Sequence, residues 1–284
     1  MERARGLDVR EGDPMNTPPG FLHIPISALE RRLYELPEQG KTLEVCGDPP
    51  DWMFERWKIT RIAPSTLKKP PVERVLPLWT LSPALTTLLS TTSSLIGETC
   101  IDIGAGCGRD AVDLALLGGT VTAVERLQSL CERIKELAAR YDVTIDILQG
   151  NLRTTLSEDL RRRGFKANIV LLSRFPYTRE IYTFVGTLVN PGGYLVLSQY
   201  HTSTSDKPSS PKMTHCISEE LIFDLLHKGP CQGCKTSGVS GKCLRRRNCG
   251  LGPRFSILKI AYSETHDGLL ILTAILHADP SDTQ

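Results

Sequence analysis

Residues 100–119 read CIDIGAGCGRDAVDLALLGG. An apolar run leads to Asp102, three glycines follow at alternate positions (Gly104, Gly106 and Gly108), and a pattern typical of a helix comes next. Glycine has no side chain, so its backbone can adopt dihedral angles closed to other residues, and a ligand can lie against the main chain. The stretch therefore predicts a strand, a ligand-binding loop and a helix in succession.

Strands and helices alternate after this loop. The strands are apolar with little alternation, which indicates that both of their faces are buried. An α/β fold with a doubly wound parallel sheet is expected, because helices must then cover both faces. Two final runs, separated by the turn-forming SETHDG, predict a closing antiparallel hairpin. The expected strands are 99–103, 120–124, 143–148, 168–172, 193–198, 255–262 and 269–278, and the expected helices are 109–118, 127–141, 156–163, 178–188 and 218–228.

The composition limits the class of protein. The chain has 284 residues, 40% of them hydrophobic and 23% charged, with a formal net charge of +2. This near-neutral balance gives no reason to expect nucleic acid as a partner. No apolar run approaches the ~20 residues that span a bilayer, and the charged N-terminus lacks the apolar centre of a secretory signal. A cytoplasmic location away from the membrane is expected, where the nine mostly scattered cysteines would be reduced thiols.

A region of different composition precedes the alternating pattern. The short strand-like pieces GLDV, KTLEV and KITRI surround the helix-like SALERRLYEL. The next stretch, APSTLKKPPVERVLP, contains four prolines and several charges, which are typical of a linker. The expected domains are therefore residues 1–64 and residues 65–284.

The charges around the glycine loop distinguish between two cofactors. A dinucleotide fingerprint reads G-x-G-x-x-G and rests a pyrophosphate on the start of the helix. Here the third glycine comes one residue early, and Arg109 stands where the fingerprint requires glycine. Asp102 precedes the loop and Asp110 follows it, so their carboxylates would repel a pyrophosphate but attract a cation. S-adenosylmethionine, with its sulfonium and ammonium groups, fits this pattern better than NAD.

The ends of the next two strands supply groups for an adenosine. Glu125 ends the second strand, where an acid can accept hydrogen bonds from both ribose hydroxyls. Asn151 follows the third strand, where it can hydrogen-bond an adenine edge, and Leu152 can lie beneath the ring. A glycine-rich turn alone can also serve only packing. The agreement of the loop, Glu125, Asn151 and the closing hairpin favours an S-adenosylmethionine site.

Residues 75–278 resemble a class I S-adenosylmethionine-dependent methyltransferase, and DIGAGCGRDAVDLA is especially similar to the tellurite-resistance, thiopurine-like branch. LWTLSP, at Leu78–Pro83, and RFPYTRE, after the fourth strand, are further similarities. The resemblance implies a Rossmann-like sheet of seven strands whose last strand is antiparallel. The family usually has Asp at the position of Asn151, although the Asn amide oxygen can still accept a hydrogen bond from the adenine amino group.

The resemblance also implies an activity and a set of site residues. A methyl group would pass to a small-molecule acceptor by in-line displacement, which depends on positioning and desolvation, so no catalytic base is assigned. Loop or lid residues without chemistry are the alternative for the aromatic side chains at the acceptor pocket. The expected cofactor-binding residues are Asp102, Gly104, Ala105, Gly106, Gly108, Arg109, Asp110, Glu125, Arg126, Asn151, Leu152, Ser173 and Arg174, and the expected acceptor-pocket residues are Phe175, Tyr177, Tyr200 and His201.

The N-terminal LDVREGDPMNTPPGFLHIPISALERRL resembles the start of a rhodanese-like domain, a family in which the next strand ends in a sulfur-carrying cysteine. Here that strand ends in Cys46. The loop that follows, CGDPPD, departs from the family pattern C-x-x-G-x-R, because Pro49 and Pro50 have no N–H to offer an anion. Asp48 and Asp51 are expected to raise the thiol pKa. The resemblance therefore implies a degenerate docking or structural module, which would bind a protein partner, rather than an active sulfurtransferase.

Residues 229–253 form an insertion rich in glycine and cysteine. Four thiolates can bind zinc in a structural site, but only the first pair has the favoured two-residue spacing, so reduced thiols without a metal are the alternative. Lys242 and the three arginines 245–247 are typical of a solvated surface and, without interleaved aromatic residues, do not indicate RNA. The candidate zinc ligands are Cys231, Cys234, Cys243 and Cys249.

Two other functions stay open beside a methyltransferase. An NAD-dependent dehydrogenase would use the same kind of sheet, but the early position of Gly108 disfavours it. A non-catalytic scaffold, in which both domains have become binding modules, is the second alternative.

Overall fold

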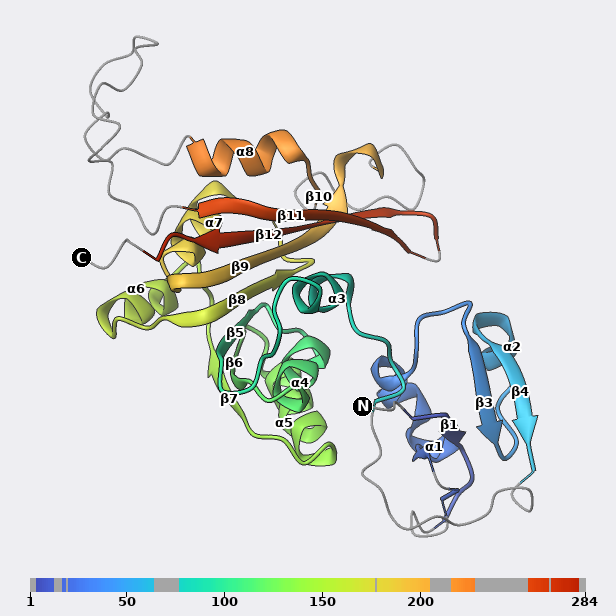
Figure 1. Cartoon of the computed structure of the whole chain (residues 1–284). Helices are drawn as coiled ribbons and strands as arrows, with labels where there is room; N and C mark the ends of the chain where they lie inside the picture. Colours follow the sequence, from blue (N-terminus) through green and yellow to red (C-terminus); the bar gives the residue numbers. More distant parts are fainter. Residues whose placement is uncertain are drawn as a thin grey trace, which may run out of the picture. The chain divides into compact units, whose positions relative to one another are not determined.

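The structure is a computed structural model that describes residues 4–12, 17–18, 20–63, 77–176, 178–204, 216–227, 255–265 and 267–280. The chain divides into two compact units (Figure 1). The first extends to Leu81 and includes Ala139–Asp142, and the second contains Ser82–Ala138 and the chain from Val143 onward. The predicted domain boundary, between residues 64 and 65, lies outside the described residues and stays a prediction.

The first unit contains a parallel sheet. Its strands are β1 (Gly6–Asp8), β2 (Phe21–His23), β3 (Thr42–Cys46) and β4 (Lys58–Ile62), and its helices are α1 (Ile26–Leu29), the 3-10 helix η2 (Glu30–Glu35) and α2 (Trp52–Arg56). The strand order is β2-β1-β3-β4, with each pair parallel. Buried apolar side chains, including Leu7, Leu22 and Val45, form its core. The sequence patterns predicted β1, β3, β4 and the helical 27–36 stretch but missed β2 and α2.

A buried ion pair holds the end of β1. Asp8 is 1% exposed, and its two carboxylate oxygens accept hydrogen bonds from Arg10 Nε and Nη2, both at 2.8 Å. The Arg10 backbone N–H also donates to the Asp8 carboxylate at 3.2 Å. These contacts give the LDVRE motif a structural role, because a buried carboxylate needs a charged partner with matched geometry.

The second unit is built on a larger mixed sheet. Its strands are β5 (Thr99–Ile103), β6 (Thr120–Glu125), β7 (Ile145–Gln149), β8 (Ala167–Ser173), β9 (Val189–His201), β10 (Cys216–Ile217), β11 (Phe255–Glu264) and β12 (Leu270–Ala278). The order is β11-β12-β9-β8-β5-β6-β7, and β10 pairs with β9. β12 runs antiparallel to both of its neighbours, which confirms the predicted closing hairpin. With β10 the sheet has eight strands, one more than the resemblance implied.

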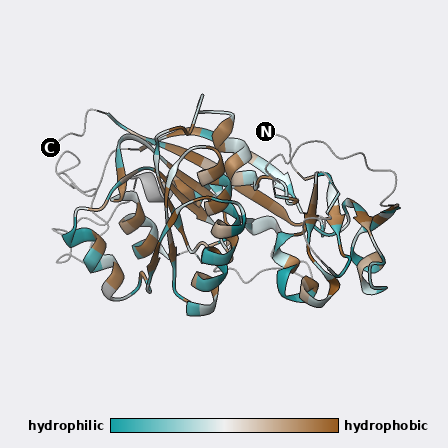
Figure 2. Cartoon of the chain, turned by 90° about the horizontal axis from the view of Figure 1, so that it is seen from below, coloured by the Kyte–Doolittle hydropathy of each residue, from teal (hydrophilic) through white to brown (hydrophobic). Residues whose placement is uncertain are grey.

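Helices cover both faces of this sheet (Figure 1). They are α3 (Pro83–Leu89), α4 (Arg109–Leu116), α5 (Gln128–Arg140), α6 (Thr155–Arg162), α7 (Arg179–Gly186) and α8 (Glu219–His227), with a short 3-10 helix, η4 (Thr202–Thr204). Residues of α6, α7 and α8 join one core cluster with the strands, whereas α3 and α4 contact the opposite face. The strands are the most hydrophobic part, and hydrophilic residues gather on the helices (Figure 2).

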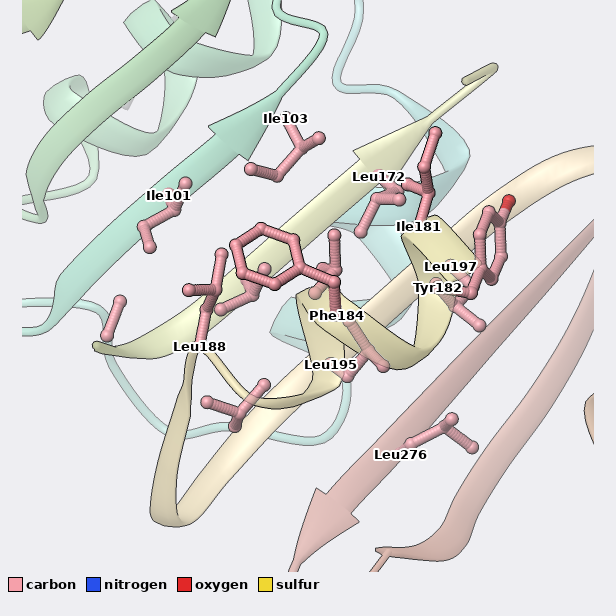
Figure 3. Packing of buried hydrophobic residues seen from close by; sticks show 14 of the residues in the cluster. Ile101, Ile103, Leu172, Ile181, Tyr182, Phe184, Leu188, Leu195, Leu197 and Leu276 are labelled. Carbon is pink, nitrogen blue, oxygen red and sulfur yellow. The ribbon is translucent and has the colours of Figure 1, made fainter. Parts of the chain in front are cut away.

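The core on the α7 face fixes the ends of the strands. Tyr182 and Phe184 of α7 belong to the same cluster of buried side chains as Leu172 of β8 and Leu195 of β9 (Figure 3). Fully burying a side chain of this size contributes roughly 1.5–3 kcal/mol. The packing therefore holds β8 and β9 in register, so that Ser173 lies beside Ser198 at the carboxyl end of β8.

The predicted strands and helices of this unit are all present among the described residues, and all except strand 99–103 have shifted ends. The largest shifts are in β9, which begins at Val189, where it pairs with Ala167 of β8, rather than at residue 193. It also extends past residue 198 to His201, because β12 pairs with it up to Tyr200 and β10 pairs with its last two residues. The helix α3, whose N-cap is Ser82 of the LWTLSP element, was not predicted. Within the ranges that the structure describes, every helix is too short or too polar to span a bilayer.

Candidate functional site

The glycine loop follows β5 and opens α4, as the sequence predicted. Gly104, Gly106 and Gly108 have φ angles of +71°, +58° and +88°, in the left-handed region that favours glycine. The Gly104 and Ala105 N–H groups both donate to the Val124 carbonyl, at 2.8 and 3.1 Å. The loop is thereby held against the end of β6. A residue with a Cβ at any of the three glycine positions would strain the backbone, because its φ angle is positive.

The three glycines have different surroundings. A Cβ on Gly104 would collide with the Phe175 ring, and one on Gly108 would lie 2.9 Å from Ile134. Among the described atoms, a Cβ on Gly106 would meet nothing closer than the Gly104 carbonyl oxygen at 4.0 Å. The first and third glycines therefore permit close packing, whereas Gly106 faces open space beside the loop.

Asp102 places a buried carboxyl group directly before the loop. It is 2% exposed, and its Oδ2 is buried without a hydrogen-bond partner among the described residues. Burial, together with the nearby carboxylates of Asp110 and Glu125, raises the Asp102 pKa well above its ordinary value. An unsatisfied buried acceptor of this kind costs free energy that a positive charge or a hydrogen-bond donor would recover.

Asp110 lies in the first turn of α4 and connects two other elements. Burial raises its pKa, while hydrogen bonds with Ser82 and Ser173 and the positive charge of Arg174 favour its ionised form. Ser82 caps α3, accepting a hydrogen bond from the Leu85 N–H at 3.3 Å. Asp110 thus joins the starts of α3 and α4 to the end of β8. Ser82 belongs to the LWTLSP element but was not predicted as a site residue.

Arg174 has an unusual backbone conformation at the end of β8. Its φ is +52°, one of two positive values for non-glycine residues in the described ranges. Its N–H donates to the Ser198 carbonyl at 2.8 Å. Left-handed backbone at a non-glycine residue costs of order 1–3 kcal/mol and is often found at functional sites. The conformation turns the chain sharply after Ser173, so that Phe175 reaches Gly104.

Glu125 lies at the end of β6 with 8% exposure. One oxygen accepts the Gly106 N–H at 3.0 Å, and the other accepts the N–H groups of Arg126 and Leu127 at 2.7 and 2.8 Å. A carboxylate has about four lone-pair sites, so Glu125 keeps capacity for one further donor. The structure therefore brings Glu125 to the glycine loop, as predicted, and shows that it also shapes that loop.

Asn151 and Leu152 follow β7. The Asn151 Oδ1 accepts the Arg153 N–H at 3.0 Å, and its carbonyl accepts the Thr154 hydroxyl at 3.0 Å. The oxygen expected to receive an adenine amino group is thus already used once, although a carbonyl oxygen has two lone pairs. Leu152 is 6% exposed and belongs to the core cluster, which leaves little of its side chain for contact with a ligand.

The residues predicted at the acceptor pocket do not all lie together. Phe175 packs on Gly104, and its carbonyl accepts a hydrogen bond from Gln199. Tyr200 and His201 are successive residues of β9, so their side chains point to opposite faces of the sheet. The prediction that both residues line the acceptor pocket stays a prediction. Tyr177 lies outside the described residues.

Gln199 is a further candidate site residue, and the sequence did not predict it. It is fully buried, and its Nε2 donates to the Phe175 carbonyl and to the Tyr182 hydroxyl. Its Oε1 is buried and has no hydrogen-bond partner in the described part of the chain. Gln199 therefore fixes the loop that covers Gly104. No local signal marks it, because both of its partners are distant in the sequence.

Cys46 ends β3 in the first unit and is fully buried. Burial raises the pKa of its thiol, with the Asp8 charge adding to the effect and Arg10 opposing it. The predicted direction is confirmed, but the cause is burial and Asp8 rather than Asp48 and Asp51. A buried thiol with a raised pKa is a poor nucleophile, because the thiolate is the reactive form.

No metal centre is found in the described part of the chain, where no three His, Cys, Asp or Glu side chains are placed to hold an ion. Cys231, Cys234, Cys243 and Cys249 lie outside the described residues, so zinc binding by the insertion stays a prediction.

Curated relatives and solved structures resemble this chain, although no family model matches it. The ubiquinone biosynthesis O-methyltransferase of Coxiella burnetii is 25% identical over 159 residues, covering 56% of this chain and 65% of that protein. The enzyme of the same name from Xanthomonas euvesicatoria pv. vesicatoria is 26% identical over 153 residues, covering 54% and 62%. The chain thus spans less than two thirds of the length of these relatives.

Among solved structures, magnesium protoporphyrin IX methyltransferase from Synechocystis PCC 6803 with bound SAM aligns with a TM-score of 0.46 and 17% identity, over 68% of this chain and 76% of that one. TehB from Haemophilus influenzae aligns with a TM-score of 0.47 and 14% identity, over 70% and 62%. The strand order of the second unit, with its antiparallel β12, is that of an α/β Rossmann-like fold with a mixed sheet.

Proposed function

We propose that residues 65–284 form an S-adenosylmethionine-dependent methyltransferase that transfers a methyl group to a small-molecule acceptor by in-line displacement. The observation that carries this proposal is the open space at Gly106 beside a buried, unsatisfied Asp102 oxygen. A cationic adenosine compound fits both features. It can lie against the backbone at Gly106, where no side chain is in the way, and its positive charge favours the ionised form of Asp102. A pyrophosphate would instead add negative charge to this acidic site.

The residues present fit this cofactor. Glu125 keeps an acceptor site for a ribose hydroxyl, and Asn151 lies at the end of the next strand for an adenine edge. Arg174, near Asp110, supplies a positive charge for the carboxylate of the methionine moiety. The cofactor supplies an electrophilic methyl group on sulfur. The other proposed contacts are Gly104, Ala105, Gly108, Arg109, Arg126, Leu152 and Ser173.

The names of the aligned relatives, ubiquinone biosynthesis O-methyltransferases, support an acceptor of small size. This chain's contribution to the reaction is positioning and the exclusion of water. Phe175, held on Gly104 by Gln199, would separate the donor from solvent on the α7 face.

A thermal-unfolding assay tests the proposal. S-adenosylhomocysteine at 100 times its Kd should stabilise the folded protein by about 2.7 kcal/mol. For a chain of this size that corresponds to a rise in melting temperature of roughly 5–11 °C. NAD at the same concentration should leave the melting temperature unchanged. Stabilisation by NAD alone would favour the dehydrogenase, and no response to either compound would favour a scaffold.

The raised pKa of Asp102 gives a second prediction. A folded-state pKa above the unfolded value of ~3.9 means that the folded protein binds more protons, so stability falls as pH rises from about 4 toward the raised pKa. Asp102→Asn should therefore raise the melting temperature of the ligand-free protein at pH 7.5, because the asparagine cannot carry the buried charge.

The same substitution should weaken S-adenosylmethionine binding, because the sulfonium and ammonium groups lose a buried negative charge. Asp159→Asn is the control, because the Asp159 side chain on α6 is 41% exposed, and it should change stability by less than about 0.5 kcal/mol. The measurement is the melting temperature from pH 4 to pH 8 with and without S-adenosylmethionine. Equal melting temperatures for wild type and Asp102→Asn across this range would contradict the role given to Asp102.

Residues 1–64 are proposed to be a degenerate rhodanese-like region. The parallel strands, the Asp8–Arg10 pair and Cys46 at the end of β3 support the likeness, while the burial of Cys46 argues against sulfur transfer. Its proposed role is docking of a protein partner or structural support. A cytoplasmic location and a structural zinc site in the 229–253 insertion are also retained as predictions.

A further inference from the structure

β11 is an edge strand of the second unit's sheet (Figure 1). It pairs with β12, and no strand among the described residues pairs with its other side. The register on β12 shifts between Ile257 and Lys259, so Leu258 is a bulge residue outside that pairing. The free side of an edge strand presents N–H and C=O groups that can pair with another chain. β11 is therefore a candidate interaction surface.

The turn between β11 and β12 shows which backbone groups of β11 face outward. The Thr265 N–H donates to the Leu269 carbonyl at 2.9 Å, directly beyond the last pair of the two strands. Hydrogen-bonded and non-hydrogen-bonded pairs alternate along an antiparallel ladder. Counting back from Thr265, Ile260, Tyr262 and Glu264 occupy non-hydrogen-bonded positions. Their N–H and C=O groups therefore point away from β12, toward the free side of the strand.

Large apolar side chains are exposed along this edge. Leu258 is 51% exposed and Tyr262 is 48% exposed. They share a face with Ile260, which packs partly against the core cluster, because alternate residues of a strand point the same way. Lys259 points to the opposite face, where its Nζ donates to the Ser90 hydroxyl at 2.6 Å. The lysine charge, a common protection of sheet edges, is therefore directed away from Leu258 and Tyr262.

The sequence of β11 is self-complementary in one antiparallel register. Leu258 and Tyr262 each lie two residues from Ile260. In a two-fold arrangement the same surface serves both copies, so a centre at Ile260 sets Leu258 of each copy opposite Tyr262 of the other. Both exposed side chains then gain an apolar cross-strand partner. A centre at Lys259 would instead oppose two like charges, and a centre at Ala261 would set Leu258 against a carboxylate.

The charged residues of β11 fit the same register. With the centre at Ile260, Lys259 lies opposite Ala261 and Glu264 lies opposite Ser256, so like charges do not meet. We propose that β11 is a dimer interface, at which it pairs antiparallel with β11 of a second copy of this chain about a two-fold axis at Ile260. The two sheets then form one continuous sheet. The proposed methyltransferase activity is a separate matter, because no residue of β11 is assigned to the cofactor or the acceptor.

Sedimentation equilibrium of the full chain under reducing conditions, from about 1 to about 100 μM, measures the dimer dissociation constant. The wild-type protein should approach twice the mass of the single chain at the upper end. Leu258→Lys and Tyr262→Glu each alter two symmetry-related pairs, so each should raise the dissociation constant by roughly tenfold or more. The double variant should recover most of this affinity at low salt, because each new lysine then faces a glutamate of the other copy.

Cross-linking tests the register independently. In the proposed dimer the two Ile260 Cα atoms face each other as a hydrogen-bonded pair, about 5.5 Å apart, which is within the range of a disulfide. Ile260→Cys should therefore form a covalent dimer under mild oxidation. Ala261→Cys is the matched control, because Ala261 faces Lys259 rather than itself, and it should cross-link no more than the wild-type protein with its native cysteines.

Ile96→Lys is the control for the added charge, because Ile96 is 79% exposed in the turn before β5, and it should leave the dissociation constant unchanged. A monomeric wild-type protein at about 100 μM would overturn the proposal. It would show that the bulge blunts the edge, or that another segment or another protein covers it. A dimer that both single substitutions leave intact, or equal cross-linking of Ile260→Cys and Ala261→Cys, would also overturn it.

Discussion

The Gly106→Val protein is expected to lose S-adenosylhomocysteine binding, with an affinity more than 100-fold below that of wild type. Gly106 faces open space beside the loop, so a valine side chain would enter the volume proposed for the cofactor, and its Cβ would meet no described atom closer than the Gly104 carbonyl oxygen at 4.0 Å. Its φ of +58° also costs roughly 1–2 kcal/mol for a side chain with a Cβ. Isothermal titration calorimetry of the folded variant measures the loss.

Gly164→Val separates the loss of space for the cofactor from the backbone cost of a side chain at positive φ. Gly164 has a φ of +60°, and no described atom lies within 4 Å of the position that a Cβ would take, but it belongs to the turn between α6 and β8. The same backbone cost should therefore lower its melting temperature about as much as Gly106→Val, while its affinity for S-adenosylhomocysteine stays within about twofold of wild type. Normal affinity in Gly106→Val, or equal loss in both variants, would show that the loop is not the binding site.

Asp8→Ala is expected to destabilise the first unit by about 3 kcal/mol. The substitution leaves Arg10 without the carboxylate that accepts two 2.8 Å hydrogen bonds at the end of β1. Removing one partner of a buried pair costs about 3–5 kcal/mol, and the lower end applies because the Arg10 side chain is 33% exposed and can regain water. Urea denaturation followed by tryptophan fluorescence measures the change, since all three tryptophans, at 52, 57 and 79, belong to this unit.

Asp48→Ala provides the matched control for Asp8. The Asp48 side chain is 94% exposed and lies 3.6 Å from Arg61, so its ion pair is screened by water. The change should therefore stay within about 0.5 kcal/mol. Similar destabilisation by both substitutions would contradict the structural role given to the Asp8–Arg10 pair.

Local sequence patterns predicted most of the strands and helices of the fold. Strand 99–103 was predicted with its observed ends, because a buried apolar run bounded by polar residues and glycines has few alternative interpretations. β10 and the last residues of β9 were not predicted, since their pairing joins Tyr200 and His201 to Cys216 and Ile217, which are distant in the sequence. α3 was missed although Ser82 and Pro83 are favourable residues for a helix start, because the helix is short and its pattern weak.

In the candidate site, too, a local sequence pattern predicted some residues and not others. The glycines, Asp102, Asp110 and Glu125 were found because they occupy fixed offsets around one strand–loop–helix unit and the end of the next strand. Gln199 was not found, since nothing near it in the sequence marks its bond to Phe175. The amide side chain of Asn151 suggested a hydrogen-bonding role. The sequence did not show that its Oδ1 already accepts the Arg153 N–H, because that hydrogen bond depends on the local turn.

The sequence by itself determined the doubly wound sheet, the bare loop at its first crossover and the acidic residues around that loop, because these depend on residue type and on spacing within a few turns or strands. Tertiary structure alone decided that Tyr200 and His201 face opposite sides, that Asp102 keeps an unsatisfied oxygen, and that Ser82 and Ser173 meet at Asp110. Those features depend on strand register and on where each strand ends. Register is fixed by the packing of distant side chains such as Tyr182 and Leu195, which no local pattern contains.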